Sequence, residues 1–190
     1  MKKIALIVLV SALTGLCMPA QETPSNLLPQ MPKEERLRQP EIREIPGFTY
    51  AYLQCKGPYA QIQAKVEEFM AMFFKQGLTP GGNFFAMYQN SPKQVKEEEL
   101  QWRLGFPVAA DTAPAAPLEK GEFTPTRAVV YLYVGPYEHV AYAYGKLAAF
   151  CDRNGYEPAG ASVEKYLDMN PMAVKPEERK TETIWPVKKK

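Results

Sequence analysis

The sequence predicts an α+β fold in which two β-α-β-β units are pseudo-symmetric repeats that share an antiparallel sheet. Helices are expected to pack on the sheet, and a central cleft is expected between the units. Three observations lead to this prediction. Short motifs recur at a constant offset, each copy carries strand and helix patterns in the same order, and 46% of the 190 residues are hydrophobic. That content suffices for one sizeable core or for two small halves that share one.

The recurring motifs lie 78 positions apart. They are Gly-Pro-Tyr at 57–59 and 135–137, GLTPGG at 77–82 with GYEPAG at 155–160, and Tyr88 with Tyr166. Order, spacing and residue type are preserved together, which indicates an internal duplication. At the same offset Glu164 corresponds to Ala86, so an acid is present in only one copy.

The first unit, residues 46–108, contains one helical pattern among three strand patterns. Apolar residues at 62, 66, 69 and 73 recur at helical spacing, and Gly77 suits the end of that helix. Aromatic and β-branched residues predict strands at 48–55, 83–89 and 99–106.

The second unit, residues 126–190, repeats this order. Strands are expected at 127–134, 161–167 and 183–187, with a helix at about 137–153 after the Gly-Pro turn. One such unit cannot cover both sides of its own sheet, whereas two units packed around a pseudo-twofold axis can, and they leave a groove between them.

The remaining segments are expected to lie outside the core. Residues 1–20 have the charged, apolar and small-residue order of a secretory signal, and its apolar run, residues 4–10, is too short for a membrane span. Cleavage after Ala20 competes with lipidation at Cys17, so the protein is expected to be exported, periplasmic or extracellular, and soluble or a lipoprotein. Residues 21–45 are predicted to be a flexible tether, and the Pro-rich residues 109–125 a linker.

Charge and composition argue against several functions. The formal net charge is +2, and Lys2 and Lys3 of the expected signal account for it, so no basic field for nucleic acid is expected. No metal-ligand spacing surrounds His139, which is the only histidine. We therefore expect no metal and no cofactor. Cys55 and Cys151 could pair in an oxidising compartment or remain two buried thiols.

Several motifs together resemble the GyrI-like, AraC-type effector-binding domain family, a relative of the SOUL haem-binding fold. They are VGPY at 134–137, NGYEP at 154–158, EKY at 164–166, LGFPV at 104–108, and Thr181-Glu182 followed by Pro186-Val187. The resemblance implies two fused β-α-β-β halves whose central cleft holds small, often aromatic or cationic, molecules. It also implies that Glu164 faces the cleft and that Glu182 can join it. The last strand departs from the family pattern, with Ile184 in place of the usual Tyr and Trp185 directly after it.

Six residues are candidates for ligand contacts: Glu164, Tyr166, Tyr52, Tyr88, Glu182 and Trp185. Strand alternation places Ser162 and Tyr166 on the face of Glu164. A carboxylate in an apolar groove would be protonated or would seek a cation, and aromatic rings favour cations too. The alternatives are an exposed strand glutamate and tyrosines that simply pack in the core. The face of the tyrosines stays open, because Tyr50 and Tyr52 correspond to Ala128 and Val130 at the offset. Either one half uses the opposite face or a bulge shifts its register.

The leading hypothesis is an exported domain that binds a small aromatic or lipophilic ligand, which can be cationic, and that is more a binding protein than an enzyme. With no span after signal removal and no DNA-binding segment, it is expected to bind or sequester its ligand. The alternative is a hydrolase of small electrophilic molecules with Glu164 as acid or base and Tyr166 as its partner. A third hypothesis is haem or tetrapyrrole binding through His139. The oligomeric state is left open.

Overall fold

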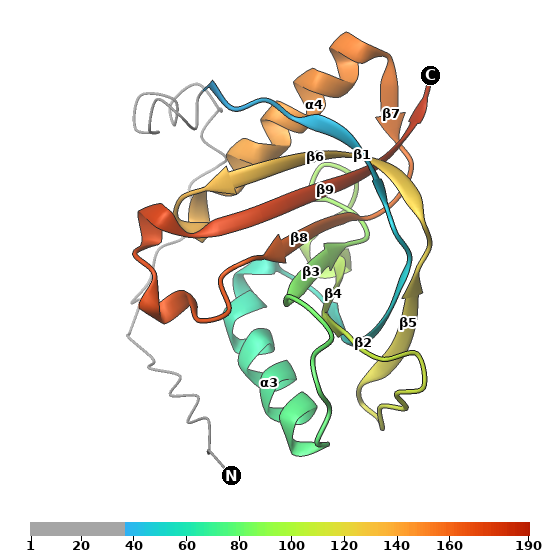
Figure 1. Cartoon of the computed structure of the whole chain (residues 1–190), viewed down its shortest axis with the longest axis vertical. Helices are drawn as coiled ribbons and strands as arrows, with labels where there is room; N and C mark the ends of the chain where they lie inside the picture. The colour runs from blue at the N-terminus through green and yellow to red at the C-terminus, as the bar shows by residue number, and fades with distance from the viewer. Residues whose placement is uncertain (1–36) are drawn as a thin grey trace.

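The computed structural model describes residues 37–190, and the expected signal, Cys17 and most of the expected tether lie outside this part of the chain. Within residues 37–190, nine strands form a sheet in the order β1-β6-β9-β8-β3-β4-β2-β5, with β7 paired to β9 beside this path (Figure 1). The strands are β1 (Glu41–Ile45), β2 (Phe48–Lys56), β3 (Phe85–Tyr88), β4 (Gln101–Pro107), β5 (Glu119–Phe123), β6 (Thr126–Val134), β7 (Tyr156–Pro158), β8 (Ser162–Tyr166) and β9 (Lys180–Lys189). Every pairing between them is antiparallel.

In the described part of the chain, two α-helices pack on this sheet, α3 (Ile62–Lys75) and α4 (Ala141–Asn154). The predicted apolar stripe forms α3, which ends just before Gly77, a glycine in the left-handed conformation with φ of 69°. Each helix follows a short 3-10 turn, η2 (Tyr59–Gln61) or η4 (Tyr137–His139). The second α-helix therefore begins four residues after the predicted start, because the Gly-Pro turn leads first into η4.

The predicted α+β class and the predicted order of elements are found in the structure. Residues 46–108, the first half, contain β2, α3, β3 and β4, whereas residues 126–190, the second half, contain β6, α4, β8 and β9 with the short β7 added. The halves meet where β3 pairs with β8 in the middle of the sheet. Residues near this junction therefore lie between the regions covered by α3 and α4.

A long bent ribbon joins the two edges of the sheet. β1 continues into β2 and β5 continues into β6, while β1 pairs with β6 and β2 with β5. The register does not change across the bend, since the two positions of each pair add up to 171, both for Glu41 with Val130 and for Phe48 with Phe123. The sheet consequently curls on itself, as β1 and β5 show at the right of Figure 1.

The bend of this ribbon depends on Gly47. A Cβ atom at Gly47 would lie 2.8 Å from Cδ of Pro125 and 2.9 Å from the carbonyl oxygen of Phe123. Such contacts are closer than packed carbon atoms tolerate, so the two strands can cross here only because Gly47 has no side chain.

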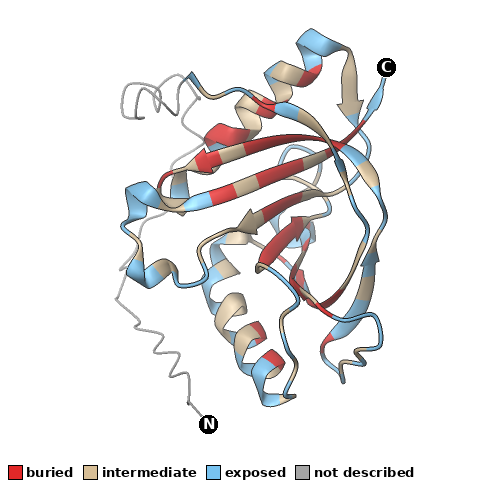
Figure 2. Cartoon of the chain, viewed as in Figure 1, coloured by how far each residue is buried: buried red, intermediate tan, exposed pale blue. Residues whose placement is uncertain are grey.

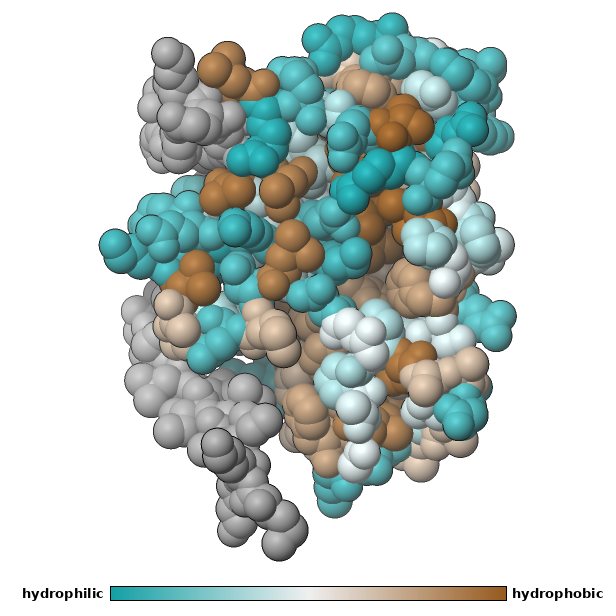
Figure 3. Space-filling view, viewed as in Figure 1, coloured by the Kyte–Doolittle hydropathy of each residue, from teal (hydrophilic) through white to brown (hydrophobic). Residues whose placement is uncertain are grey.

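Three clusters of buried residues form the core, and Figure 2 shows them concentrated on the central strands. The α3-side core comprises Ala51, Leu53, Cys55, Phe69, Phe73, Ala86, Trp102, Leu104, Phe106, Val108 and Leu118. The α4-side core comprises Val129, Tyr131, Tyr133, Tyr142, Ala143, Leu147, Cys151 and Val187. The inner core, enclosed by the curl of the sheet, comprises Tyr50, Tyr52, Phe85, Met87, Ala128, Val130, Val163 and Ile184. Figure 3 shows apolar residues inside the hollow of the molecule, framed by hydrophilic ones.

The faces used by the strand tyrosines are now clear. Tyr50 and Tyr52 belong to the inner core, together with Ala128 and Val130, their counterparts at the offset of 78. Tyr131 and Tyr133 face α4 instead. Corresponding positions thus use corresponding faces, and neither a swapped face nor a bulge is needed. Each half simply places its tyrosines on a different face.

Two expectations about the flanking segments need correction. Residues 41–45 of the expected tether form β1, which pairs with β6 through five residues. Residues 119–123 of the expected linker form β5, which pairs with β2. Both strands escaped prediction because they are short and rich in charge, and their ladders are completed only by residues far away in the sequence.

The cysteines and the helices bear on two further expectations. Cys55 and Cys151 are both free and buried, in different core clusters, which agrees with the alternative of two buried thiols. Among residues 37–190, no helix combines the length and apolar character that a membrane crossing requires.

Candidate functional site

Glu164 lies at the junction of the two halves. In the β3–β8 ladder it faces Ala86 directly, and these two positions differ by the same 78 residues as the sequence motifs. Val163 and Lys165 point to the other side of the sheet, so Glu164 faces the helices together with Ser162 and Tyr166. The carboxylate is almost completely buried, with 3% of the residue exposed.

Three tyrosine hydroxyls donate hydrogen bonds to the Glu164 carboxylate. Tyr166 of β8 donates to Oε2 at 2.9 Å, and Tyr88 of the neighbouring β3 donates to the same oxygen at 3.1 Å. Tyr144 of α4 donates to Oε1 at 3.0 Å, and its hydroxyl also lies 3.4 Å from Oγ of Ser162. The three donors come from both halves, so the folding of the whole domain is required to assemble this site.

The electrostatics of Glu164 are those of a buried acid without a cation. Among residues 37–190, none of the ion pairs formed by basic side chains involves this carboxylate. Burial raises the pKa of Glu164 above its ordinary value, and the hydrogen bonds from Tyr166, Tyr144 and Tyr88 oppose this rise only in part. The loss of hydration destabilises the charged form of Glu164 more than the three hydrogen bonds stabilise it.

The pKa values of the three tyrosines are raised as well. Burial, and then the negative charge of Glu164, raise the pKa values of Tyr88, Tyr144 and Tyr166 well above the ordinary value of a phenol. These hydroxyls therefore stay protonated at neutral pH and remain hydrogen-bond donors. None of them is a candidate nucleophile.

A second layer of aromatic rings surrounds the hydroxyl cluster. Tyr59 of η2 packs edge-on against Tyr88, with ring centroids 5.0 Å apart, and Tyr137 of η4 packs edge-on against Tyr166 at 5.1 Å. The two pairs have nearly the same interplanar angle, 73° and 79°. Phe84 stacks on Tyr166 at 5.6 Å. The carboxylate is thus enclosed in an aromatic shell that presents ring faces and edges as well as hydroxyls.

Four of the six predicted site residues come together in this shell. Glu164, Tyr88 and Tyr166 are in direct contact through hydrogen bonds. Trp185 of β9 contacts the shell through Tyr144, edge-on at 6.3 Å, and so supports the tyrosine that α4 contributes. The structure places the other two predicted residues, Tyr52 and Glu182, on the opposite side of the sheet.

Tyr52 belongs to the inner core. Its hydroxyl donates a hydrogen bond to Glu119 at 2.8 Å, and the guanidinium of Arg103 lies over its ring at 4.4 Å. Strand alternation separates it from the Glu164 face, because the helix-facing residues of β2 are Ala51, Leu53 and Cys55. A contact between Tyr52 and a molecule at Glu164 is therefore not possible across the sheet.

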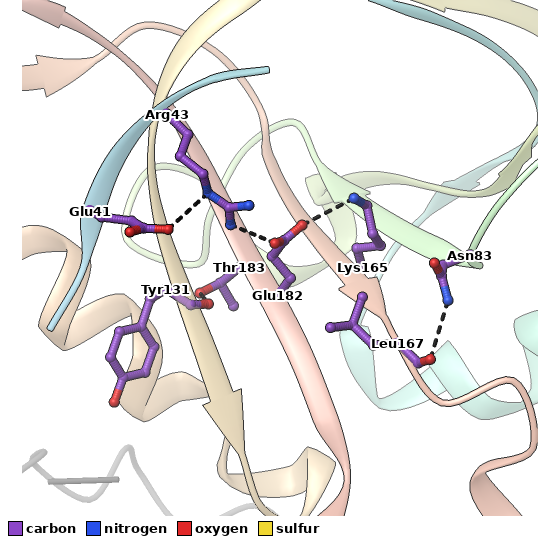
Figure 4. Close-up of polar contacts among 8 residues, drawn as sticks. All are labelled: Glu41, Arg43, Asn83, Tyr131, Lys165, Leu167, Glu182 and Thr183. Carbon is purple, nitrogen blue, oxygen red and sulfur yellow. Dashed lines mark hydrogen bonds and ion pairs between the residues drawn. The ribbon is translucent and has the colours of Figure 1, made fainter. Parts of the chain in front are cut away.

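Glu182 is held by basic side chains (Figure 4). Arg43 donates to Oε1 at 2.5 Å, and Lys165 donates to Oε2 at 3.0 Å. In the β8–β9 ladder Glu182 faces Lys165, whereas Glu164 faces Thr183, so the two carboxylates lie on opposite faces. Burial acts to raise the pKa of Glu182, but the hydrogen bonds and charges of Arg43 and Lys165 outweigh it and lower the pKa. The expectation that Glu182 joins Glu164 is not met.

The expected cleft is closed at Glu164. A hollow of about 320 Å³ is instead lined by residues of the bent ribbon, namely Gly47, Phe48, Thr49, Glu122, Phe123, Thr124 and Pro125. None of these residues belongs to the shell around Glu164. A molecule that reached the carboxylate would have to displace tyrosine side chains first.

Among the described residues, no group of three or more histidines, cysteines or acids could hold a metal ion. His139 ends η4 and is partly exposed. The arrangement around Glu164 offers a carboxylate, hydroxyl donors and aromatic rings, which can bind a cation or move a proton.

Sequence reasoning missed four members of the shell, Tyr59, Tyr137, Tyr144 and Phe84. A signal for the first two was present, because each is the tyrosine of a repeated Gly-Pro-Tyr motif. The Gly-Pro turn ends a strand and starts a 3-10 turn at that tyrosine, which places it beside Tyr88 or Tyr166. Tyr144 gave no distinct signal, since it lies on the apolar stripe of α4 like any core residue.

Comparison with known proteins shows which family has this architecture. The family model of the GyrI-like small molecule binding domain matches residues 38–188. The chain belongs to this family. The match includes both halves and β1, so the domain begins before the predicted boundary at residue 46. No curated protein matches the chain significantly.

Solved structures share the GyrI-like fold at low sequence identity. The crystal structure of the EcmrR C-terminal domain has a TM-score of 0.72 and 23% identity, and covers 81% of this chain and 99% of that one. EcmrR in a DNA complex gives 0.68 and 23%, with 87% of this chain and 64% of that chain covered. A hydrolase encoded by lin2189 from Listeria innocua gives 0.59 and 16%, with 82% and 96% covered. SAV2435 bound to tetraphenylphosphonium gives 0.56 and 12%, with 79% and 94% covered.

Proposed function

We propose that this GyrI-like domain binds a small lipophilic aromatic cation at Glu164. The observation that carries the proposal is a buried carboxylate with three hydroxyl donors and no basic partner among the described residues. A cation at this place would supply the missing counter-charge. The tyrosine rings of the shell would add cation–π attraction, which is strongest where water is excluded.

Tyrosine hydroxyls can serve as placeholders for such a ligand. Hydrogen bonds from neutral donors stabilise a buried carboxylate less than a cation at contact distance does. A ligand with a positive centre can therefore take their place at Glu164, while the displaced rings turn their faces to it. Tyr144 is suited to such a movement because Ser162 lies within reach of its hydroxyl once Glu164 is occupied.

The relatives support this choice of ligand class. SAV2435 shares the fold and carries tetraphenylphosphonium, a cation whose charge is shielded by four phenyl rings. A site of this kind requires a desolvated acid and aromatic walls, because a shielded cation gains little from a solvated carboxylate. Both features are present around Glu164.

Isothermal titration calorimetry with tetraphenylphosphonium tests the proposal. We expect micromolar binding by the wild-type domain and a loss of affinity of at least tenfold in Glu164→Gln, which removes the charge and keeps the shape. Glu182→Gln is the matched control, since Glu182 is a partly buried acid on the other face. Equal binding by wild type and Glu164→Gln would refute the role of Glu164, and equal losses in both variants would indicate an unspecific effect of charge.

We also propose that the two halves arose by duplication and that the site lies on their pseudo-twofold axis. The pairing of Ala86 with Glu164 supports this, because a local axis relates only such a pair to itself. The matching geometry of Tyr59 with Tyr88 and Tyr137 with Tyr166 supports it too. On this view the axis carries one charge, so the site has a polarity that a symmetric groove would lack.

Export remains a proposal from the leader pattern of residues 1–20. Mass spectrometry of the protein purified from an exporting bacterial host would test it. A mature chain that starts at Gln21 is expected for a soluble protein, and a lipidated Cys17 for an anchored one. An unprocessed chain that starts at Met1 would refute export.

A second candidate function is hydrolysis of a small electrophile. The raised pKa of Glu164 favours it, because burial makes this carboxyl a weaker acid and a better base, so that it can give and take a proton, with Tyr166 to orient the substrate. Turnover of a cyclopropane-type electrophile that vanishes in Glu164→Gln would establish it. Absence of turnover alongside tight binding of tetraphenylphosphonium would leave binding as the function.

A further inference from the structure

Two buried hydroxyls beside Tyr166 have no hydrogen-bond partner in the described part of the chain. They are Oγ1 of Thr181 and Oη of Tyr137. Thr181 is 0% exposed and faces Tyr166 directly in the β8–β9 ladder, so the two side chains lie on the same face of the sheet. Tyr137 packs edge-on against the ring of Tyr166. Both hydroxyls therefore adjoin the shell around Glu164.

The first half has the corresponding residues, and there both polar groups are satisfied. Tyr59 corresponds to Tyr137, and its hydroxyl donates to the carbonyl oxygen of Asn90 at 2.7 Å. Trp102 faces Tyr88 as Thr181 faces Tyr166, and its indole N–H donates to the carbonyl oxygen of Gly57 at 3.2 Å. The shell is thus complete on one side of Glu164 and lacks two hydrogen bonds on the other.

The exchange of tryptophan for threonine accounts for the difference in packing. In the first half the ring of Trp102 packs edge-on against Tyr59 at 6.2 Å. Thr181 has no ring to offer Tyr137, over which the guanidinium of Arg179 lies instead at 5.1 Å. A buried threonine hydroxyl and a buried phenol hydroxyl, both next to Tyr166 and both without a partner, are unfavourable unless something else bonds to them.

We propose that Thr181 and Tyr137 form a polar subsite that accepts a carbonyl oxygen of the ligand bound at Glu164. Each hydroxyl carries one donor hydrogen, and a carbonyl oxygen has two lone pairs, so one ligand group can satisfy either donor or both. The ligand class is then an aromatic cation that bears a ketone, ester or amide on one ring. This inference rests on the proposed function, since it extends the same site.

A comparison of stability without ligand tests the premise. Thr181→Val and Tyr137→Phe remove hydroxyls that have no partner, so neither is expected to lower the melting temperature, and a rise is expected where desolvation is relieved. Tyr59→Phe removes a bonded hydroxyl and is expected to lower it by several degrees. A fall in both Thr181→Val and Tyr137→Phe as large as that in Tyr59→Phe would overturn the inference, because it would show that both hydroxyls are already bonded.

Two cations that differ by one amide test the subsite itself. We expect (4-carbamoylphenyl)triphenylphosphonium to bind the wild-type domain about three- to tenfold more tightly than tetraphenylphosphonium, as one net hydrogen bond implies. The ratio is expected to fall to about one in at least one of Thr181→Val and Tyr137→Phe, the variant that removes the hydroxyl bonded to the amide. Tyr142→Phe is the matched control, since this hydroxyl also lacks a partner among the described residues but its ring packs against Tyr131 of β6, which β9 separates from the strand of Tyr166.

The outcomes separate this inference from the proposed function. Binding of both cations in a Glu164-dependent way without any preference for the amide overturns the subsite and keeps the function. The subsite is also overturned, and the function kept, if the preference survives in both Thr181→Val and Tyr137→Phe, or is lost equally in Tyr142→Phe. If neither cation binds, or if Glu164→Gln binds them as well as wild type, the proposed function fails and the subsite fails with it.

Discussion

Ala86 and Glu164 face one another across the β3–β8 ladder, at the junction of the two halves. Ala86 is 0% exposed and belongs to the α3-side core, so the first half contributes a methyl group where the second contributes a carboxylate. Facing side chains in an antiparallel pair have Cβ atoms about 5 Å apart. A second acid at this place would therefore lie against the first, and the buried site has room for one charge only.

Introducing that second acid should destabilise the protein in a pH-dependent way. For Ala86→Glu we expect a loss of about 3 kcal/mol or more in the free energy of unfolding at pH 7, because two buried carboxylates would repel each other without a cation. Ala86→Gln has nearly the same volume and no charge, so it isolates the packing cost. Urea unfolding at pH 7 and pH 4 measures both. A constant gap between the two variants at both pH values would contradict the charge argument.

The raised pKa of Glu164 predicts the sign of one contribution to stability. An acid whose pKa is higher in the folded than in the unfolded state binds more protons when folded, so its contribution falls as pH rises above about 4.5. Glu164→Gln should therefore gain stability relative to wild type between pH 4 and pH 7. Urea unfolding across this range is the measurement.

Glu182 gives the opposite expectation and serves as the control. Its pKa is lowered in the folded state, so its contribution is present above the unfolded pKa and is lost as pH falls through the folded pKa. Glu182→Gln should thus lose stability relative to wild type at pH 7 and recover at low pH. Parallel pH profiles for the two variants would show that neither carboxylate titrates as its surroundings indicate.

The close crossing at Gly47 predicts a cost for any side chain there. Gly47→Ala would bring a methyl group within 2.8 Å of Pro125, on the ribbon that joins the sheet edges, and we expect a loss of about 1–3 kcal/mol. Gly160→Ala is the control, because its added carbon would meet Pro186 at an ordinary 3.4 Å. Thermal unfolding measures the loss of stability in both variants. A Gly47→Ala protein as stable as Gly160→Ala would show that the ribbon can relax at its bend.

Local periodicity was enough to predict most of the fold. The stripe that includes Phe69 and Phe73 predicted α3, and the repeated Gly-Pro-Tyr motif marked the turn from strand to helix in both halves. β1 and β5 could not be predicted in the same way. Their sequences, EIREI and EKGEF, alternate only weakly, and they become strands because β6 and β2 offer them a free edge.

The candidate site was predictable in part for a related reason. Glu164, Tyr88 and Tyr166 lie on short strands whose alternation fixes their face, whereas the position of Tyr144 depends on how α4 packs on the sheet. Glu182 was wrongly predicted to join Glu164, because the family resemblance implied this role while the sequence did not show which residue of β8 faces Glu182. The register pairs it with Lys165, one position from Glu164 and therefore on the other face.

Removing a tyrosine hydroxyl that donates to Glu164 should destabilise the charged carboxylate and therefore the folded protein. For Tyr166→Phe we expect a loss of about 1.5–3 kcal/mol at pH 7, the range for hydrogen bonds to charged groups, and a further rise in the pKa of Glu164. The loss should shrink towards pH 4, because a protonated Glu164 needs fewer donors. Tyr142→Phe, whose hydroxyl bonds to none of the described residues, should cost almost nothing. If Tyr166→Phe lost the same amount at both pH values, the hydroxyl would be supporting the packing of the shell, and Glu164 would not depend on it for its charge.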